Sequence, residues 1–353
     1  MRIVRKPVPP RPVPGTTRGA FVDTIGTVWM WVAFAAIVLA ALAVDLLVLR
    51  QRGPHKVGVR EALLWSIVWI GLAGLFNLAL WGYLHELTTP VEADRIALEF
   101  LTGYLVEKAL AVDNIFVFLL LFTYFAVPAE QQQRALILGV LGAIALRAAM
   151  IFIGAALIAR FHWVLYLFGV FLLVTGAKML LIAGRPPDLE LNPVLRWLTA
   201  HLPLTRGYRG AALWVGAGSE RRYTPLFIVL VMIGVTDLIF AVDSIPAIFA
   251  ITTDPFVVLT SNVFAVLGLR ALYFLLAGMA ERFHLLGYGL AGVLIFIGGK
   301  MLLVDVYKVP IGVALAVVAG MLATAMILSL LIPPRAVNGP APKSAAPRPA
   351  KRG

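Results

Sequence analysis

Runs of about 20 apolar residues recur along this chain, and they limit the folds that are open to it. Hydrophobic residues make up 61% of its 353 residues, and the mean hydropathy is +0.93, which is too apolar for a soluble globular domain. Runs of this length cross a bilayer as helices, and they lack the alternation of a barrel strand. Because lipid offers no partners to backbone N–H and C=O groups, a spanning helix satisfies them internally. The sequence therefore predicts an all-α, polytopic transmembrane helical bundle.

We predict about nine membrane-spanning helices from these runs. The predicted spans lie near residues 27–49, 60–84, 96–126, 134–158, 162–183, 225–251, 256–280, 284–304 and 310–332. They form two N-terminal helices, two units of three helices each and a last helix, with the bounds 21–95, 96–183, 225–305 and 306–333. The segment 184–224 is predicted as a cytoplasmic linker with an amphipathic patch at 194–202, and the basic, Pro-rich tails 1–20 and 334–353 as disordered.

The distribution of charge predicts the orientation in the membrane. The net charge is +12, but the basic residues lie in tails and loops without interleaved aromatic residues, which argues against nucleic acid as a partner. The first loop is basic, whereas the second is acidic, with Glu86, Glu92 and Asp94 against Arg95. The linker and the C-terminal tail are also basic, so the positive-inside bias predicts an N-terminus outside and a cytoplasmic C-terminus in a bacterial inner membrane. The basic N-terminal tail alone opposes this orientation.

Several kinds of chemistry are excluded or unsupported. The chain has no cysteine, which excludes disulfides and thiolate metal sites. It has no Gly-rich phosphate loop, no His-Glu-x-x-His motif and no nucleophile–base pair that rises above chance. We therefore expect neither an enzyme nor a tightly bound cofactor.

Two similar stretches place carboxylates inside apolar helices. The first runs from Glu107 to Asp113 and Asn114, and the second from Asp237 to Asp243 and Ser244. Each has an acid, then a second acid six residues later within Ala-Val-Asp, then a small polar residue. An ionised carboxylate at membrane depth costs several kcal/mol unless it is paired or hydrated. A chain that carries this cost at two matching places is expected to bind a cation there.

Other pieces repeat along the chain with a similar separation. Arg-Phe-His occurs at 160–162 and 282–284, Gly-x-Lys-Met-Leu-Leu at 176–181 and 298–303, and Leu-Arg-Ala at 146–148 and 269–271. The helices of 96–183 therefore match those of 225–305. Since each unit has an odd number of spans, consecutive units must have opposite orientations. Inverted repeats of this kind are typical of transporters, with the substrate site at the repeat interface.

The acids and their neighbours form a candidate metal site. Residues seven apart return to nearly the same helix face, so Glu107 shares a stripe with Asn114 and Asp237 with Ser244. The second acid of each stretch, Asp113 or Asp243, lies about 100° round the helix from this stripe. We predict a site formed by Glu107, Asp113, Asn114, Asp237, Asp243 and Ser244. Carboxylate, amide and hydroxyl oxygens suit Mn²⁺, Mg²⁺ or Ca²⁺. In the alternative interpretation, the acids pair with buried basic residues and only hold helices together.

Two arginines near mid-span are the natural counter-charges of these acids. Arg147 and Arg270 could exchange with a transported cation, or they could form static ion pairs with the carboxylates. Asp45 lies near the cytoplasmic end of the first span, where it lines an entry path or pairs with nearby basic residues.

These residues resemble the TerC family of bacterial integral membrane proteins, which includes Alx-type members. The resemblance covers 21–331 and is strongest at 100–114, 224–227, 236–250 and 260–274. It implies a metal transporter, most often for Mn²⁺ efflux, in a family whose name records an association with tellurium resistance. It also implies that the acids of the Ala-Val-Asp stretches are the ones used. Many members have a Glu where this chain has Gly234, and this difference bears on selectivity or coupling.

Three functions remain in competition. The first is export of a divalent cation, with Mn²⁺ favoured and protons as an optional coupling ion. The second is a non-transporting membrane scaffold in a tellurite or metal stress response. The third is export of another small solute. A tellurium oxyanion would require cationic groups or helix N-termini at the site, whereas the repeated buried groups include four acids.

Overall fold

The computed structural model describes residues 24–52, 58–182, 192–205, 207–210, 212–217, 220–277, 285–307 and 309–332. The helices before the linker are α1 (Val28–Arg52), α2 (Val59–Leu87), α3 (Pro90–Tyr124), α4 (Ala129–Arg160) and α5 (Val164–Ile182). The linker contains α6 (Pro193–His201) and the antiparallel strands β1 (Trp214–Val215) and β2 (Arg222–Tyr223). The remaining helices are α7 (Pro225–Phe249), α8 (Pro255–Leu267), α9 (Leu269–Ala277), α10 (Leu286–Leu302) and α11 (Ile311–Leu331).

Proline and capping residues define several helix starts. Proline occupies the first turn of α3, α7 and α8, where its missing N–H leaves no hydrogen bond unmade. The side chain of Thr89 accepts a hydrogen bond from the Glu92 N–H at the start of α3. Asp254 does the same for the N–H groups of Phe256 and Val257 at the start of α8. These local signals end one helix and begin the next within a few residues.

An all-α membrane bundle is the architecture observed. Five described helices are long and apolar enough to span a membrane, namely α2, α4, α5, α7 and α11. The number is six if α8 and α9, which are bent by 41° at Gly268, form one broken span. The prediction of about nine spans exceeds these numbers and stays a prediction. The amphipathic patch expected at 194–202 coincides with α6, which packs Leu195 and Leu198 against the bundle.

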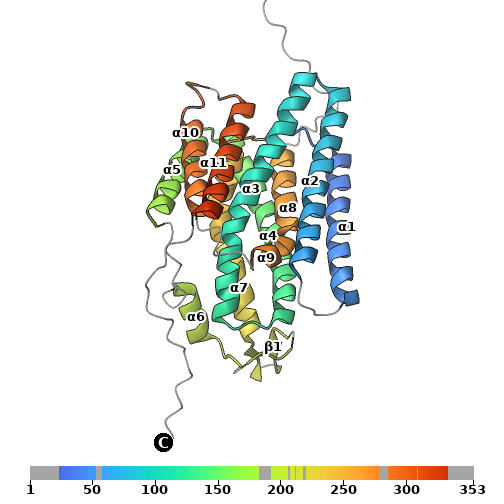
Figure 1. Ribbon diagram of the computed structural model, residues 1–353, viewed down its shortest axis with the longest axis vertical. Coiled ribbons are helices and arrows are strands. Elements are labelled where there is room, and N and C mark those ends of the chain that lie inside the picture. Colours follow the sequence, from blue (N-terminus) through green and yellow to red (C-terminus); the bar gives the residue numbers. More distant parts are fainter. Residues whose placement is uncertain are drawn as a thin grey trace, which may run out of the picture.

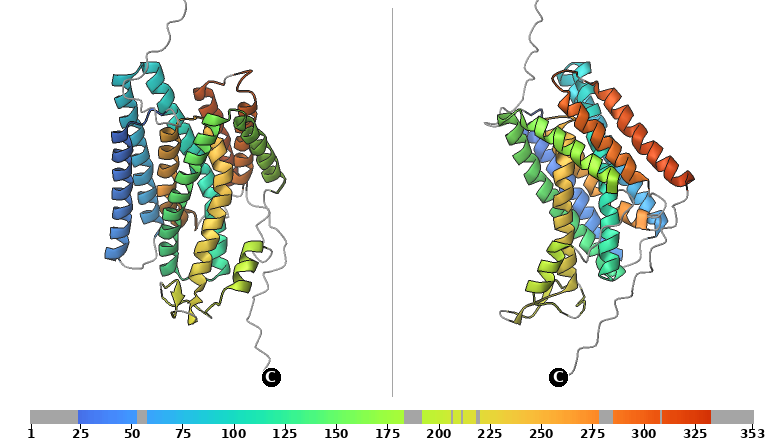
Figure 2. Two further views of the ribbon diagram at one scale, coloured as in Figure 1. Left: turned by 180° about the vertical axis from the view of Figure 1, so that it is seen from behind. Right: turned by 90° about the vertical axis from the view of Figure 1, so that its left-hand side faces the viewer.

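Most of the closely packed helix pairs join helices that are distant in sequence. The views in Figures 1 and 2 show α3 and α7 running in opposite directions, with α6 and the small hairpin gathered at the end of the bundle where α7 begins. The pairs α3–α8, α4–α7 and α5–α10 pack closely. Glycines allow the α5–α10 contact, because a Cβ on Gly298 would lie 2.8 Å from the Gly169 carbonyl oxygen. The α5–α10 pair thus depends on glycines that let the two backbones approach closely.

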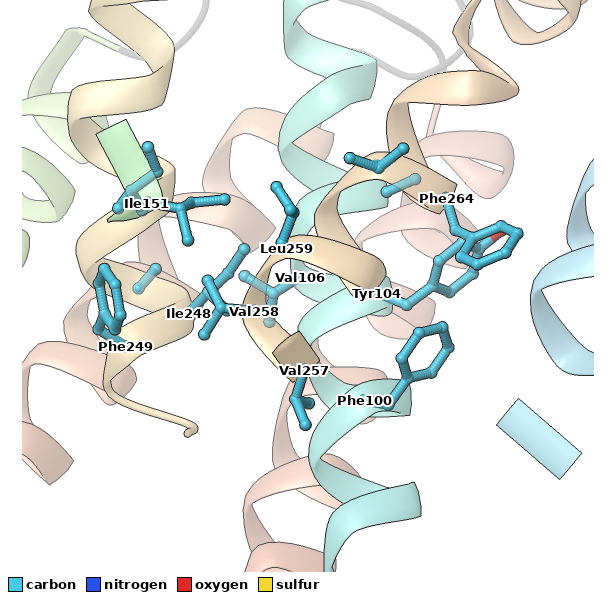
Figure 3. Close-up of a cluster of buried hydrophobic side chains, with 14 of the residues drawn as sticks. Phe100, Tyr104, Val106, Ile151, Ile248, Phe249, Val257, Val258, Leu259 and Phe264 are labelled. Carbon is cyan, nitrogen blue, oxygen red and sulfur yellow. The ribbon is translucent and has the colours of Figure 1, made fainter. Parts of the chain in front are cut away.

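Helix α8 lies at the centre of the molecule. Every one of its 13 residues is buried. Figure 3 shows its Val257, Val258, Leu259 and Phe264 among side chains of other helices, including Phe100 and Ile248. A helix break exposed to lipid would leave backbone groups unsatisfied, but such a break is tolerated where protein surrounds it. The central position of α8 therefore explains how the chain accommodates the bend at Gly268.

Candidate functional site

Arg147 of α4 is the centre of a buried polar cluster. Its side chain is 1% exposed, and both terminal nitrogens donate hydrogen bonds. Nη1 contacts Glu107 Oε1 and donates to Asn262 Oδ1 at 3.1 Å and to Ser244 Oγ at 3.5 Å. Nη2 donates to Asp237 Oδ1 at 3.1 Å. One guanidinium is thus held by oxygens of four residues.

These four residues come from three other helices. Glu107 lies on α3, Asp237 and Ser244 lie on α7, and Asn262 lies on the wholly buried α8. Asp237 and Ser244 both reach Arg147, as expected for two residues seven apart on one helix. Asn262 also donates from Nδ2 to Glu107 Oε2 at 3.2 Å. The cluster therefore joins the first acidic stretch to the second through one arginine.

The cluster does not satisfy all of its polar atoms. Glu107, Asp237 and Arg147 carry two negative charges and one positive charge when all are ionised, which leaves one uncompensated negative charge among them. Within the part of the chain that the structure describes, Asp237 Oδ2 and Arg147 Nε of the cluster are buried and have no hydrogen-bond partner. The same holds for Asn114 Oδ1, which belongs to α3, seven residues after Glu107. A buried acceptor without a partner costs about 1–3 kcal/mol. Two of these three atoms are oxygens that a cation or a water could engage.

The other predicted site residues are placed differently. Asp243 is half-buried and faces α5, where Thr175 Oγ1 donates to its Oδ1 at 3.4 Å. Arg270 is buried at the start of α9, beside the bend at Gly268. The side chains of Asp113 on α3 and Asp45 on α1 lie outside the described part of the structure. The structure thus brings Glu107, Asp237, Ser244 and Arg147 together, but not Asp243.

The acidic side chains that the structure describes do not form a metal cage by themselves. Among the described residues there is no group of three or more His, Cys, Asp and Glu side chains placed to hold a metal ion. The oxygens near Arg147 are two carboxylates, one amide and one hydroxyl. This mixed set of hard oxygen donors fits a cation such as Mn²⁺ or Mg²⁺ only if backbone oxygens, water or further side chains complete the coordination.

Two residues of this region were missed by sequence reasoning. Asn262 bridges Arg147 and Glu107, and the signal that could have found it is the polar run Thr260-Ser261-Asn262 inside an apolar helix. Lys108 follows Glu107, and its Nζ donates to the Ala265 carbonyl oxygen at 3.1 Å, close to the C-terminal end of α8. A cation at a helix C-terminus offsets the negative end of the helix dipole, so Lys108 stabilises the break between α8 and α9.

Comparison with known proteins identifies the family. The model described as "Integral membrane protein TerC family" matches residues 92–336. Proteins of Escherichia coli (strain K12) and Shigella flexneri, each named "Putative membrane-bound redox modulator Alx", are 53% identical over 307 residues, which covers 87% of this chain and 96% of each relative. An "Uncharacterized membrane protein STKORF319" of Myxococcus xanthus is 43% identical over 308 residues, 87% of this chain and 94% of that protein. No solved structure matches significantly. The chain belongs to the TerC family of integral membrane proteins.

Proposed function

We propose that this protein exports a divalent metal cation, with Mn²⁺ as the favoured substrate, and that Arg147 occupies the cation position when no metal is bound. The observation that carries the proposal is the set of four oxygens around one buried guanidinium. A guanidinium tethered to the protein neutralises the carboxylates at a place where an empty acidic cavity would be costly. A metal that enters the site displaces Arg147 and takes over its oxygen partners.

The unpartnered atoms favour such an exchange over a static ion pair. A purely structural pair is expected to satisfy its buried oxygens, because each one left without a partner lowers stability. Asp237 Oδ2 and Asn114 Oδ1 are left without one. Both residues belong to the predicted metal site, and we assign to their free oxygens the role of additional metal ligands. Asp113 and Asp243 act in this proposal as further ligands along the path of the ion.

The packing of the helices supports an alternating-access mechanism built on two inverted units. Helices α3 and α7, which carry the two acidic stretches, run in opposite directions (Figure 1). If α3 is equivalent to α7, and α4 is equivalent to α8 and α9 taken together, then the contact of α3 with α8 is equivalent to the contact of α7 with α4. In this proposal the chain crosses a bacterial inner membrane about nine times, with the N-terminus outside and the C-terminus in the cytoplasm. Protons are the coupling ion, because they compete with the metal for the same carboxylates.

The test is transport by the full-length protein in liposomes that contain a Mn²⁺-sensitive dye. We expect the wild-type protein to carry Mn²⁺ and Asp237→Asn to lose this activity, because the substitution removes a charged ligand without changing the side-chain size. Glu130→Gln is the matched control, since Glu130 is exposed in the first turn of α4, away from the cluster. Equal Mn²⁺ flux through the wild-type and Asp237→Asn proteins would overturn the proposal.

A membrane scaffold is the second candidate, and the ion pairs of Arg147 favour it because they tie α4 to both α3 and α7. A scaffold predicts no Mn²⁺ flux through the wild-type protein, together with loss of stability when Glu107 is changed to glutamine. Some relatives are named as redox modulators, which suggests a role in redox modulation as a variant of this second candidate. This chain has no cysteine, so a redox role here would have to proceed without thiols of its own.

A further inference from the structure

The linker between α5 and α7 forms a structured unit at one end of the bundle. We call residues 192–223 the collar; the structure describes them except for 206, 211, 218 and 219. Figure 1 shows α6 beside the end of the bundle where α7 begins and the hairpin of the collar just beyond that end. The hydrogen bonds described above for Arg147 involve no residue of the collar.

Specific contacts attach the collar to the bundle. Leu195 and Leu198 of α6 are buried in a hydrophobic cluster that also contains Leu226 of α7. The hydroxyl of Tyr208 donates to the Phe125 carbonyl oxygen at 2.9 Å, just after the end of α3. Thr224 Oγ1 donates to the Ala212 carbonyl oxygen at 2.8 Å. The collar is therefore a surface of defined shape and not a loose connection.

The surface of the collar is strongly basic. Its sequence contains five arginines and one acidic residue, Glu220, which gives a formal charge of +4 with histidine neutral. The four arginines that the structure describes are all exposed: Arg196, Arg209, Arg221 and Arg222. Positive charge gathered on a small surface attracts an anionic partner, and a plane of anionic headgroups is the anion nearest to the end of a spanning helix.

Two tryptophans stand among these arginines. Trp197 is 58% exposed and stacks on His201, with ring centroids 4.9 Å apart. Trp214 is 44% exposed, and the Arg221 guanidinium lies over its ring at 4.4 Å from the centroid. An amphipathic indole prefers the headgroup level of a bilayer, where its ring is partly apolar and its N–H is hydrated. Exposed tryptophan next to arginine is thus suited to a lipid surface, whereas a soluble acidic partner would not require exposed indole rings.

We propose that the collar binds the headgroups of anionic phospholipids in the adjacent leaflet, with the exposed arginines contacting phosphate and Trp197 and Trp214 inserted at the headgroup level. Basic residues close to an anionic leaflet each contribute roughly fivefold in affinity at moderate salt. Loss of Arg221 and Arg222 together is therefore expected to weaken the preference for anionic lipid by about 25-fold, which is the product of two such factors.

The experiment measures lipid binding to the full-length protein in detergent. Phosphatidylglycerol or phosphatidylcholine is titrated in, and the bound lipids are counted by native mass spectrometry. We expect the wild-type protein to retain phosphatidylglycerol in preference to phosphatidylcholine, and this preference to fall with added KCl because exposed charges are screened. The double variant Arg221→Gln/Arg222→Gln should lose most of the preference, and Arg221→Lys/Arg222→Lys should keep it.

Arg160→Gln is the matched control. Arg160 is exposed at the other end of α4 and also contacts an aromatic ring, with its guanidinium 5.8 Å from the Phe161 centroid. It should retain the wild-type preference for phosphatidylglycerol. Equal retention of phosphatidylglycerol by the wild-type protein and the glutamine double variant would overturn the proposal, as would an equal loss in Arg160→Gln. A thermal unfolding curve unchanged from wild type shows that the double variant is folded.

Discussion

Replacing Arg147 with glutamine removes a positive charge that contacts both Glu107 and Asp237. The glutamine amide is shorter than the guanidinium and cannot donate to Glu107, Asn262, Ser244 and Asp237 together, as Arg147 does. Two buried carboxylates then remain without this cation between them. The variant therefore tests both the stability of the cluster and the proposal that Arg147 occupies a cation position.

The magnitude follows from the burial of the partners. Glu107 is fully buried and Asp237 is 4% exposed, so solvent screens neither charge effectively. Breaking a buried ion pair by removing one partner costs about 3–5 kcal/mol, because a charge remains buried without compensation. Changing Glu107 to glutamine in the same chain should recover part of this loss, since only Asp237 then remains charged. The two substitutions are in contact and are expected to be non-additive.

The assay is thermal unfolding of each variant in detergent, with and without Mn²⁺. We expect Arg147→Gln to unfold at a lower temperature than the wild-type protein, and Mn²⁺ to stabilise the variant more than the wild type. A ligand that binds only the folded state adds stability that grows with the ratio of its concentration to its dissociation constant. In the variant, Mn²⁺ no longer competes with an arginine side chain.

Two results would refute this reasoning in different ways. An unchanged unfolding temperature in Arg147→Gln would mean that the ion pairs contribute little. If Arg147→Gln loses stability and Mn²⁺ does not restore it in any variant, the ion pairs have a structural role and the cluster does not bind the metal. The surface variant Glu130→Gln should match the wild type in both conditions, because Glu130 is exposed.

Three further predictions concern other parts of the chain. Asp113→Asn and Asp243→Asn should each abolish Mn²⁺ export while the protein still inserts, and wild-type Mn²⁺ tolerance of cells that carry either variant would contradict this. Gly268→Val should lower the yield of folded protein measured by size-exclusion chromatography, because a Cβ there would lie 2.8 Å from Lys108 Nζ and 3.1 Å from Trp69 Cβ; an unchanged yield would contradict this. Asp254→Ala should lower the free energy of unfolding by about 1–2 kcal/mol in denaturant titrations, because Asp254 caps α8 and also accepts the Ile25 N–H at 2.6 Å; equal stability would argue against this cap.

Much of the architecture and part of the site follow from local regularities of the sequence. Long apolar runs require helices in lipid, and this consequence does not depend on how the helices pack. The seven-residue spacing of Asp237 and Ser244 places both on one face of α7 whatever lies opposite, and both contact Arg147. An arginine inside an apolar span needs an acidic partner, and this need identified Arg147 as a counter-charge of the acids.

The choice among possible partners depended on tertiary packing. Arg147 and Arg270 occur in the same Leu-Arg-Ala motif, but no local rule says which carboxylates each one faces. Asp243 lies about 100° round the helix from Ser244, so the identity of its neighbour depends on which helix packs there, and that helix is α5. Asn262 enters the cluster only because α8 is buried at the centre of the bundle. The period of a helix determines which residues share a face, whereas the partners of that face depend on how helices distant in sequence pack together.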